Sequence, residues 1–131
     1  MRYPMILLLL AATTQPAQAE PMTAEEFDAY TRGKTLHFAE AGQDYGAERY
    51  LPGRRVLWSF LDGQCKEGRW YAEERDICFV YEDDPEPQCW QFTLTPRGLS
   101  AVFVNDPGAT LELYEAREAD EMLCLGPRIG V

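Results

Sequence analysis

The chain has 131 residues, and its 12 Lys and Arg against 22 Asp and Glu give a formal net charge of −10 at pH 7. This length is enough for one domain with one modest hydrophobic core, and it is too short for two. A surface this acidic repels phosphate backbones and anionic lipids, which disfavours nucleic-acid binding. The charge is typical of a soluble exported protein, and it also permits a basic protein partner.

Residues 1–19 have the pattern of an export signal. Arg2 is followed by an apolar run over 5–12 and by Ala17-Gln18-Ala19, a small-x-small cleavage site. The run is shorter than the roughly 20 residues that span a bilayer as a helix. No cysteine follows the cleavage site to carry a lipid anchor. We therefore expect a periplasmic or secreted protein, with no stable membrane insertion once the signal is removed.

The first element after the signal is predicted to be a short helix over 24–32. Residues 23–26 (Thr-Ala-Glu-Glu) form a capping box, in which Thr and Glu satisfy each other's free backbone amides. Gly33 favours a stop at the other end. Phe27 and Tyr30 are three residues apart and share one face, so we expect this helix to cover something larger.

After the helix the apolar pattern changes to a period of two. Turn signals separate eight segments that we predict as strands: 35–41, 46–51, 54–61, 66–73, 76–82, 88–95, 99–104 and 110–116. The connections are too short for crossover helices, so neighbouring strands are antiparallel.

The predicted fold class is therefore mainly β. A sheet of about eight strands in up-and-down order, with one apolar face, most simply pairs its edge strands by closing into a small barrel. A flattened or open barrel and a curled open sheet are the alternatives. Residues 20–131 form one domain, whose tail over 117–131 is expected to contain a turn of helix at 118–122 followed by an extended segment.

Two of the four cysteines are predicted to face each other across a hairpin. Residues 83–87 read as its turn. If Tyr81 pairs with Glu86, Cys78 lies directly opposite Cys89, at a distance that a disulfide can bridge.

The remaining pair, Cys65 and Cys124, would then tie the tail to the wall of the sheet. A redox or metal site is less favoured, because the chain has no Cys-x-x-Cys motif and His37 is its single histidine. We therefore predict two structural disulfides, no metal and no cofactor.

No catalytic residue is predicted. His37 lies within a predicted strand, and neither Ser59 nor Ser100 lies in a nucleophile turn. The acidic cluster at 83–86 lacks the ligand spacing of a calcium loop and is expected to be a solvated hairpin tip. A pair of carboxylates assembled in space, as in glycoside hydrolases, remains an alternative.

Aromatic residues are the strongest candidates for a binding function. Tryptophans on the apolar face either fill the interior of a small barrel or line a pocket for an apolar ligand. The candidate lining residues are Trp58, Trp70, Phe79, Tyr81, Trp90 and Phe92.

One pattern of turn glycines, tryptophans and cysteines resembles a known group of proteins. It reads Trp58-x-Phe60-x-Asp62-Gly63-x-Cys65-x2-Gly68-x-Trp70, followed by Ile77-Cys78-Phe79 and Cys89-Trp90. It is similar to short exported alphaproteobacterial proteins of unknown function, and the resemblance implies a disulfide-braced β-meander. The general build is also analogous to that of the periplasmic lysozyme inhibitors, without a matching inhibitory motif.

These observations favour a non-catalytic exported protein that binds a small apolar ligand or a partner in the cell envelope. The alternatives are an acidic inhibitor of a basic envelope enzyme such as lysozyme, and a hydrolase with a spatially assembled carboxylate site.

Overall fold

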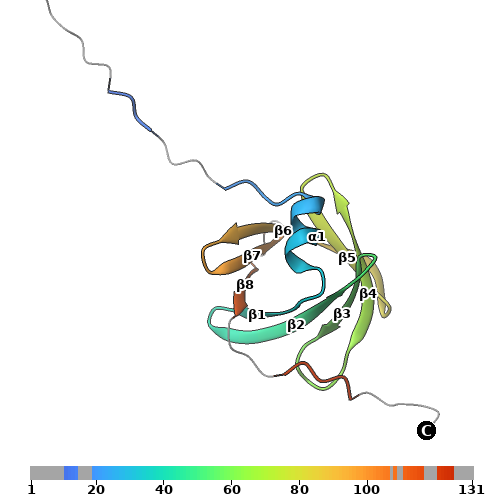
Figure 1. Cartoon of the computed structure of the whole chain (residues 1–131). Helices are drawn as coiled ribbons and strands as arrows, with labels where there is room; N and C mark the ends of the chain where they lie inside the picture. Colours follow the sequence, from blue (N-terminus) through green and yellow to red (C-terminus); the bar gives the residue numbers. More distant parts are fainter. Residues whose placement is uncertain (1–10, 15–18, 107, 109–110, 117–120, 126–131) are drawn as a thin grey trace, which may run out of the picture.

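The computed structural model describes residues 11–14, 19–106, 108, 111–116 and 121–125. One helix precedes eight strands (Figure 1). Their bounds are α1 (Ala24–Thr31), β1 (Thr35–Glu40), β2 (Gln43–Leu51), β3 (Arg55–Ser59), β4 (Lys66–Glu73), β5 (Asp76–Tyr81), β6 (Asp84–Thr95), β7 (Gly98–Phe103) and β8 (Glu112–Ala116).

The strands form a closed antiparallel barrel, so the predicted fold class is confirmed. Each strand pairs with the next along the chain, and β8 pairs with β1 to close the ring. At the closure His37 lies opposite Ala116, and Ala39 lies opposite Tyr114. The sheet is therefore closed rather than open or curled.

Helix α1 begins at the predicted capping box and ends at Thr31, one residue earlier than predicted. The Glu26 amide donates to the Thr23 hydroxyl over 3.2 Å, and the Thr23 amide donates to the Glu26 carboxylate over 3.4 Å. Gly33 follows with a φ of +79°, a conformation that favours glycine. The local sequence thus fixes both ends of the helix.

The turn between β5 and β6 differs from the prediction. Tyr81 lies opposite Asp84 rather than Glu86, although Cys78 does lie opposite Cys89. The register shift between these pairs places a bulge in β6, over 85–87. Two of these three residues are prolines, which have no N–H to donate to the ladder, and this favours a bulge over regular pairing.

Other strand bounds differ as well: β3 ends at Ser59, two residues before its predicted end, and β6 begins at Asp84, four residues before its predicted start. β2 begins at Gln43, three residues before its predicted start, and its pairing with β1 contains a second bulge. Of the predicted turn of helix at 118–122, residues 118–120 lie outside the described residues, and Glu121 and Met122 have no regular secondary structure.

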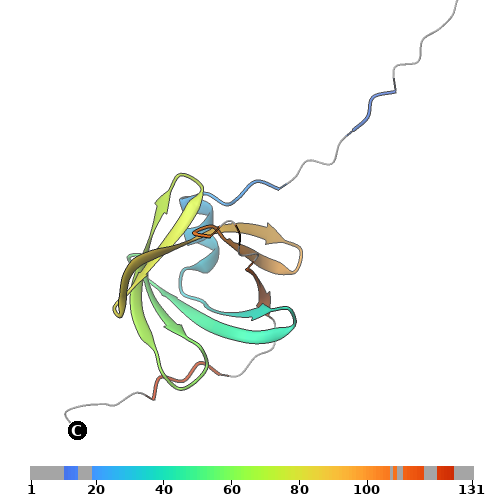
Figure 2. The same cartoon turned by 180° about the vertical axis from the view of Figure 1, so that it is seen from behind.

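Helix α1 lies across one end of the barrel, in front in Figure 1 and behind in the reversed view of Figure 2. Phe27 is completely buried there. Its ring lies 5.6 Å from that of Tyr50, 5.1 Å from Trp70, 6.3 Å from Phe79 and 4.5 Å from Phe92. The helix therefore fills this end with an aromatic core.

A polar contact holds the helix in place. The Tyr30 hydroxyl donates to the Glu115 carboxylate over 2.7 Å, and the Leu99 amide donates to the same oxygen over 2.8 Å. Burial, and then the hydrogen bond to Glu115, raise the pKa of Tyr30 to about 12. One carboxylate thus joins α1 to β7 and β8.

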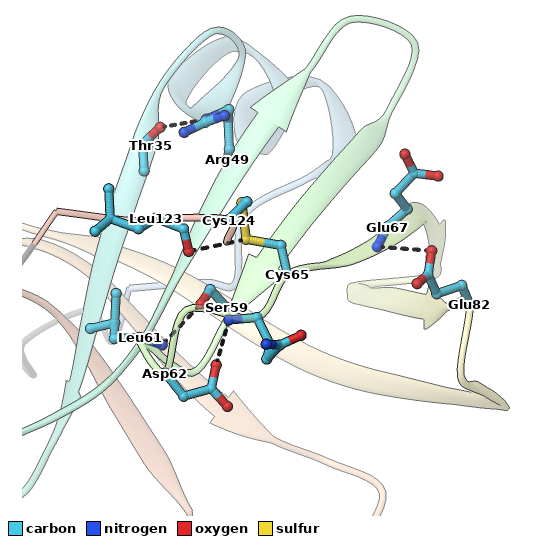
Figure 3. The surroundings of a disulfide bond; sticks show 11 residues. Thr35, Arg49, Ser59, Leu61, Asp62, Cys65, Glu67, Glu82, Leu123 and Cys124 are labelled. Carbon is cyan, nitrogen blue, oxygen red and sulfur yellow. Dashed lines mark hydrogen bonds between the residues drawn. A yellow bond between two sulfur atoms is a disulfide. The ribbon is translucent and has the colours of Figure 1, made fainter. Parts of the chain in front are cut away.

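Two disulfides brace the barrel, in the pairing expected from the sequence. Cys78–Cys89 crosses β5 and β6, and Cys65–Cys124 joins the β3–β4 loop to the C-terminal segment. Figure 3 shows Leu123 and Cys124 of that segment beside Cys65 of the loop. The Leu125 amide also donates to the Gly63 carbonyl over 2.7 Å. Within the described part of the chain, no helix is long and apolar enough to cross a membrane.

Removing the Cys65–Cys124 bond should lower stability more than removing Cys78–Cys89. The first bond spans a sequence separation of 59 residues and the second spans 11. In the chain-entropy model they contribute about 4 and about 3 kcal/mol, respectively. The measurement is denaturant unfolding of the two double Cys→Ala variants. An equal or reversed order would contradict this account of the tail.

Candidate ligand-binding cavity

The half of the barrel away from α1 is hollow. It contains a cavity of about 260 Å³ that is lined by residues from all eight strands or their turns. Tyr50, Phe79 and Phe92 form its floor, because they line the cavity and also pack against Phe27. The other lining residues are Phe38, Tyr45, Glu48, Trp58, Phe60, Lys66, Tyr81, Asp83, Asp84, Gln88, Trp90, Ala101 and Leu113.

One wall is a cluster of three aromatic rings. The Trp58 ring lies 5.9 Å from that of Tyr45 and 5.3 Å from that of Phe60. Tyr45 is the unpaired residue of the β1–β2 bulge, since Phe38 pairs with Gly46 and the next pair is Ala39 with Asp44. The bulge thus places an extra aromatic side chain on the cavity wall.

Gly46 makes room for this wall. A Cβ atom at this position would lie 2.3 Å from the Trp58 ring and 2.7 Å from the Ser59 carbonyl oxygen. The indole therefore lies directly against the backbone of β2, which any larger residue would prevent. On another wall the rings of Phe79 and Tyr81 are parallel, with centroids 6.3 Å apart.

Glu48 is an acidic side chain buried in this aromatic cavity, with 2% of its surface exposed. The Tyr81 hydroxyl donates to Glu48 Oε1 over 2.9 Å. The second oxygen, Oε2, has no hydrogen-bond partner among the described residues. Burial raises the pKa of Glu48 from 4.5 to about 8, and the Tyr81 hydrogen bond offsets this only partly.

The tyrosines around Glu48 are perturbed as well. Burial, and then the nearby charge of Glu48, raise the pKa of Tyr50 and Tyr81 well above 10. Both phenols therefore remain neutral hydrogen-bonding groups at physiological pH.

Charged residues lie at the mouth of the cavity. The Lys66 ammonium lies 2.7 Å from the Asp83 carboxylate and 5.4 Å from the centre of the exposed Phe60 ring. The hydrogen bond from Lys66 lowers the pKa of Asp83. Asp84 lines the same side, so the described residues at the mouth supply two carboxylates and one ammonium.

Five of the six aromatic residues nominated from the sequence lie on the cavity: Trp58, Phe79, Tyr81, Trp90 and Phe92. The sixth, Trp70, does not. It packs against Phe27 at the filled end, and the guanidinium of Arg54 lies 4.5 Å from the centre of its ring.

Sequence reasoning missed Glu48, although a signal was present. Strand alternation places residues 46, 48 and 50 on one face of β2, and Tyr50 is an obvious core residue. A charged residue on an inward face is the anomaly that should have been singled out. Tyr45 could not be found in this way, because the bulge breaks the period.

The residues weighed for catalysis are not gathered in the cavity. His37 lies on β1 between the buried Leu36 and Phe38 and is not a lining residue. Ser59 is buried, and its hydroxyl accepts a hydrogen bond from the Leu61 amide over 3.0 Å (Figure 3). Among the described residues, no group of three or more potential metal ligands is found.

Comparisons with protein-family models, with curated proteins and with solved structures found no match for this chain.

Replacing Glu48 with Gln should remove a pH-dependent loss of stability. The unfolded chain releases the Glu48 proton near pH 4.5, whereas the folded protein keeps it up to about pH 8. Between these values the folded state holds the extra proton, so its free energy of unfolding falls as pH rises, by about 1 kcal/mol per pH unit. Gln has no proton to lose.

The measurement is urea unfolding of both proteins from about pH 5 to pH 8. The stability of the Gln variant relative to the parent should increase steadily over this range, and subtraction cancels the other titrating groups. A difference that stays constant with pH would show that Glu48 is not a buried acid.

Proposed function

We propose that this protein is a non-catalytic binding protein that holds a small, mainly apolar ligand inside the barrel. The observation that carries the proposal is the aromatic cavity of about 260 Å³ behind an open mouth. Closed barrels of eight strands either fill their interior with side chains or hold one small ligand. Here α1 fills one half and leaves the other half available.

The volume indicates the size of the ligand. A core cavity of about 150 Å³ holds benzene, so 260 Å³ accommodates about ten non-hydrogen atoms. Aromatic walls with a few convergent polar groups are typical of small-molecule sites. The hollow interior favours a cargo in the barrel over an inhibitor that acts through its outer surface.

A hydrolytic site is less well supported. Paired-carboxylate catalysis needs two acids that flank the reacting bond. Glu48 is the one acidic side chain buried in the core among the described residues, and Asp83 and Asp84 lie at the mouth. Binding therefore accounts for the cavity more simply than catalysis does.

Filling the cavity should weaken binding strongly. Ala101 is a buried lining residue, and Ala101→Leu would place a larger side chain in the empty space. Tryptophan fluorescence reports occupancy, because Trp58 and Trp90 line the cavity. We expect propylbenzene to shift the emission of the parent protein, and the Leu variant to bind it at least about tenfold more weakly.

Val102→Leu provides the matched control, because Val102 is 44% exposed on the outer face of the same strand. It should bind propylbenzene like the parent. Equal binding by the Ala101 variant, or no emission shift in the folded parent, would overturn the proposed function.

We further propose that the protein works outside the cytosol, in the periplasm, after residues 1–19 are removed. Among the described residues, hydrogen bonds to the barrel begin just after the predicted signal. The Arg75 guanidinium donates to the Pro21 carbonyl over 2.9 Å, and the Met22 amide donates to the Phe92 carbonyl over 2.7 Å. Residues 11–14 are exposed and without regular secondary structure.

Protein purified from its native host should therefore start at Glu20 and contain no free thiols. Intact-mass measurement without reduction, together with N-terminal sequencing, tests both points. An uncleaved chain, or one with reduced cysteines, would overturn this location. The test leaves the chemistry of the cavity unaffected, so the two proposals can fail separately.

A further inference from the structure

We propose that the ligand is an organic cation, an amine with a compact apolar group, whose ammonium pairs with Glu48 in the depth of the cavity. This inference rests on the proposed function and specifies its ligand class. Its physical basis is one unpaired carboxyl oxygen surrounded by aromatic rings.

Glu48 has one buried carboxyl oxygen whose hydrogen-bonding capacity is not satisfied by any described residue. Glu48 Oε1 accepts from the Tyr81 hydroxyl, whereas Oε2 is buried without a partner and belongs to a cavity-lining side chain. A buried polar atom without a partner costs free energy, and it is uncommon in folded proteins. A ligand N–H that reached Oε2 would satisfy it.

The aromatic walls also favour a cation. Cations are attracted to the faces of Trp and Tyr rings, most strongly where water is excluded. Tyr45 and Trp58 lie on one wall, and the stacked Phe79 and Tyr81 lie on another. Such walls accommodate both an ammonium and the apolar group attached to it.

The charge at the mouth likewise favours a cation. Asp83 and Asp84 outnumber Lys66 there, and the chain as a whole carries a net charge of −10. This field attracts cations and repels anions on their way into the cavity. An anionic ligand would in addition have to be buried beside the Glu48 carboxyl, which is unfavourable.

Binding of a cation should be coupled to loss of a proton. With a pKa of about 8, about a tenth of Glu48 is ionised at pH 7, and this lowers the apparent affinity by about tenfold. The affinity of the ammonium should therefore rise from pH 6 to pH 8. The titratable and charged groups around Glu48 and the cavity are Tyr45, Tyr50, Tyr81, Lys66, Asp83, Asp84 and Glu115.

The experiment compares three probes with the same number of non-hydrogen atoms: phenethylammonium, 2-phenylethanol and propylbenzene. Calorimetry or tryptophan fluorescence gives their affinities for the full chain with both disulfides intact. We expect phenethylammonium to bind at least about tenfold more tightly than propylbenzene at pH 8, with 2-phenylethanol between them. Its affinity should fall as the pH is lowered to 6.

Glu48→Gln should remove the preference for the ammonium and its pH dependence, so that this variant binds phenethylammonium no more tightly than propylbenzene at pH 6 and at pH 8. Any titration of the other charged groups persists in this variant, so the comparison isolates Glu48. If the variant does not fold, the order of the three probe affinities on the parent protein, with its change between pH 6 and pH 8, tests the inference.

The failures of the two proposals are distinguishable. Propylbenzene that binds as tightly as phenethylammonium would overturn the cation inference and leave the binding function standing. An ammonium preference that persists in Glu48→Gln would also overturn the inference. The absence of binding by all three probes would overturn the proposed function itself.

Discussion

The burial of Phe27 is the contact on which the architecture of this barrel depends. Its ring touches four aromatic residues at one end of the strands, and its helix is fixed by a cap at the start and by the Tyr30–Glu115 hydrogen bond near its end. Phe27 thus fills one end of the interior, so that the barrel is not open at both ends. Because of this contact, the interior is a cavity with one opening rather than a channel through the barrel.

Most of the fold could be predicted from the sequence, because its signals are local. The capping box at Thr23 defines the helix, and period-two patterns with short turns define an up-and-down meander. The pairing of Cys78 with Cys89 could be predicted as well, because both lie in the regular part of the β5–β6 ladder. The predicted Tyr81–Glu86 pair was wrong because two prolines, at 85 and 87, favour a bulge, and a bulge changes register without changing hydrophobic pattern.

The candidate site was only partly predictable. The aromatic residues on regular strands, such as Trp90, could be found because alternation fixes their face. Tyr45 depends on a bulge, and the position of the Trp58 indole depends on the missing Cβ of Gly46, a contact between two strands that no local pattern reveals. Trp70 does face the interior, as strand alternation predicts. Its place at the filled end rather than in the cavity depends on its contact with Phe27, which alternation does not reveal.

Glu48 determines which ligand chemistry the cavity favours, and its burial lowers the stability of the fold. An acid buried among aromatic rings stays protonated at neutral pH, so the empty protein avoids an unpaired charge while one oxygen still lacks a partner. A purely structural role would be met equally well by apolar side chains of similar shape at both Glu48 and Tyr81, since replacing both partners of a buried hydrogen bond is often neutral or stabilising. A destabilising acid that faces an accessible cavity is therefore better explained by what enters the cavity than by the fold, because functional sites are where local rules of stability are broken.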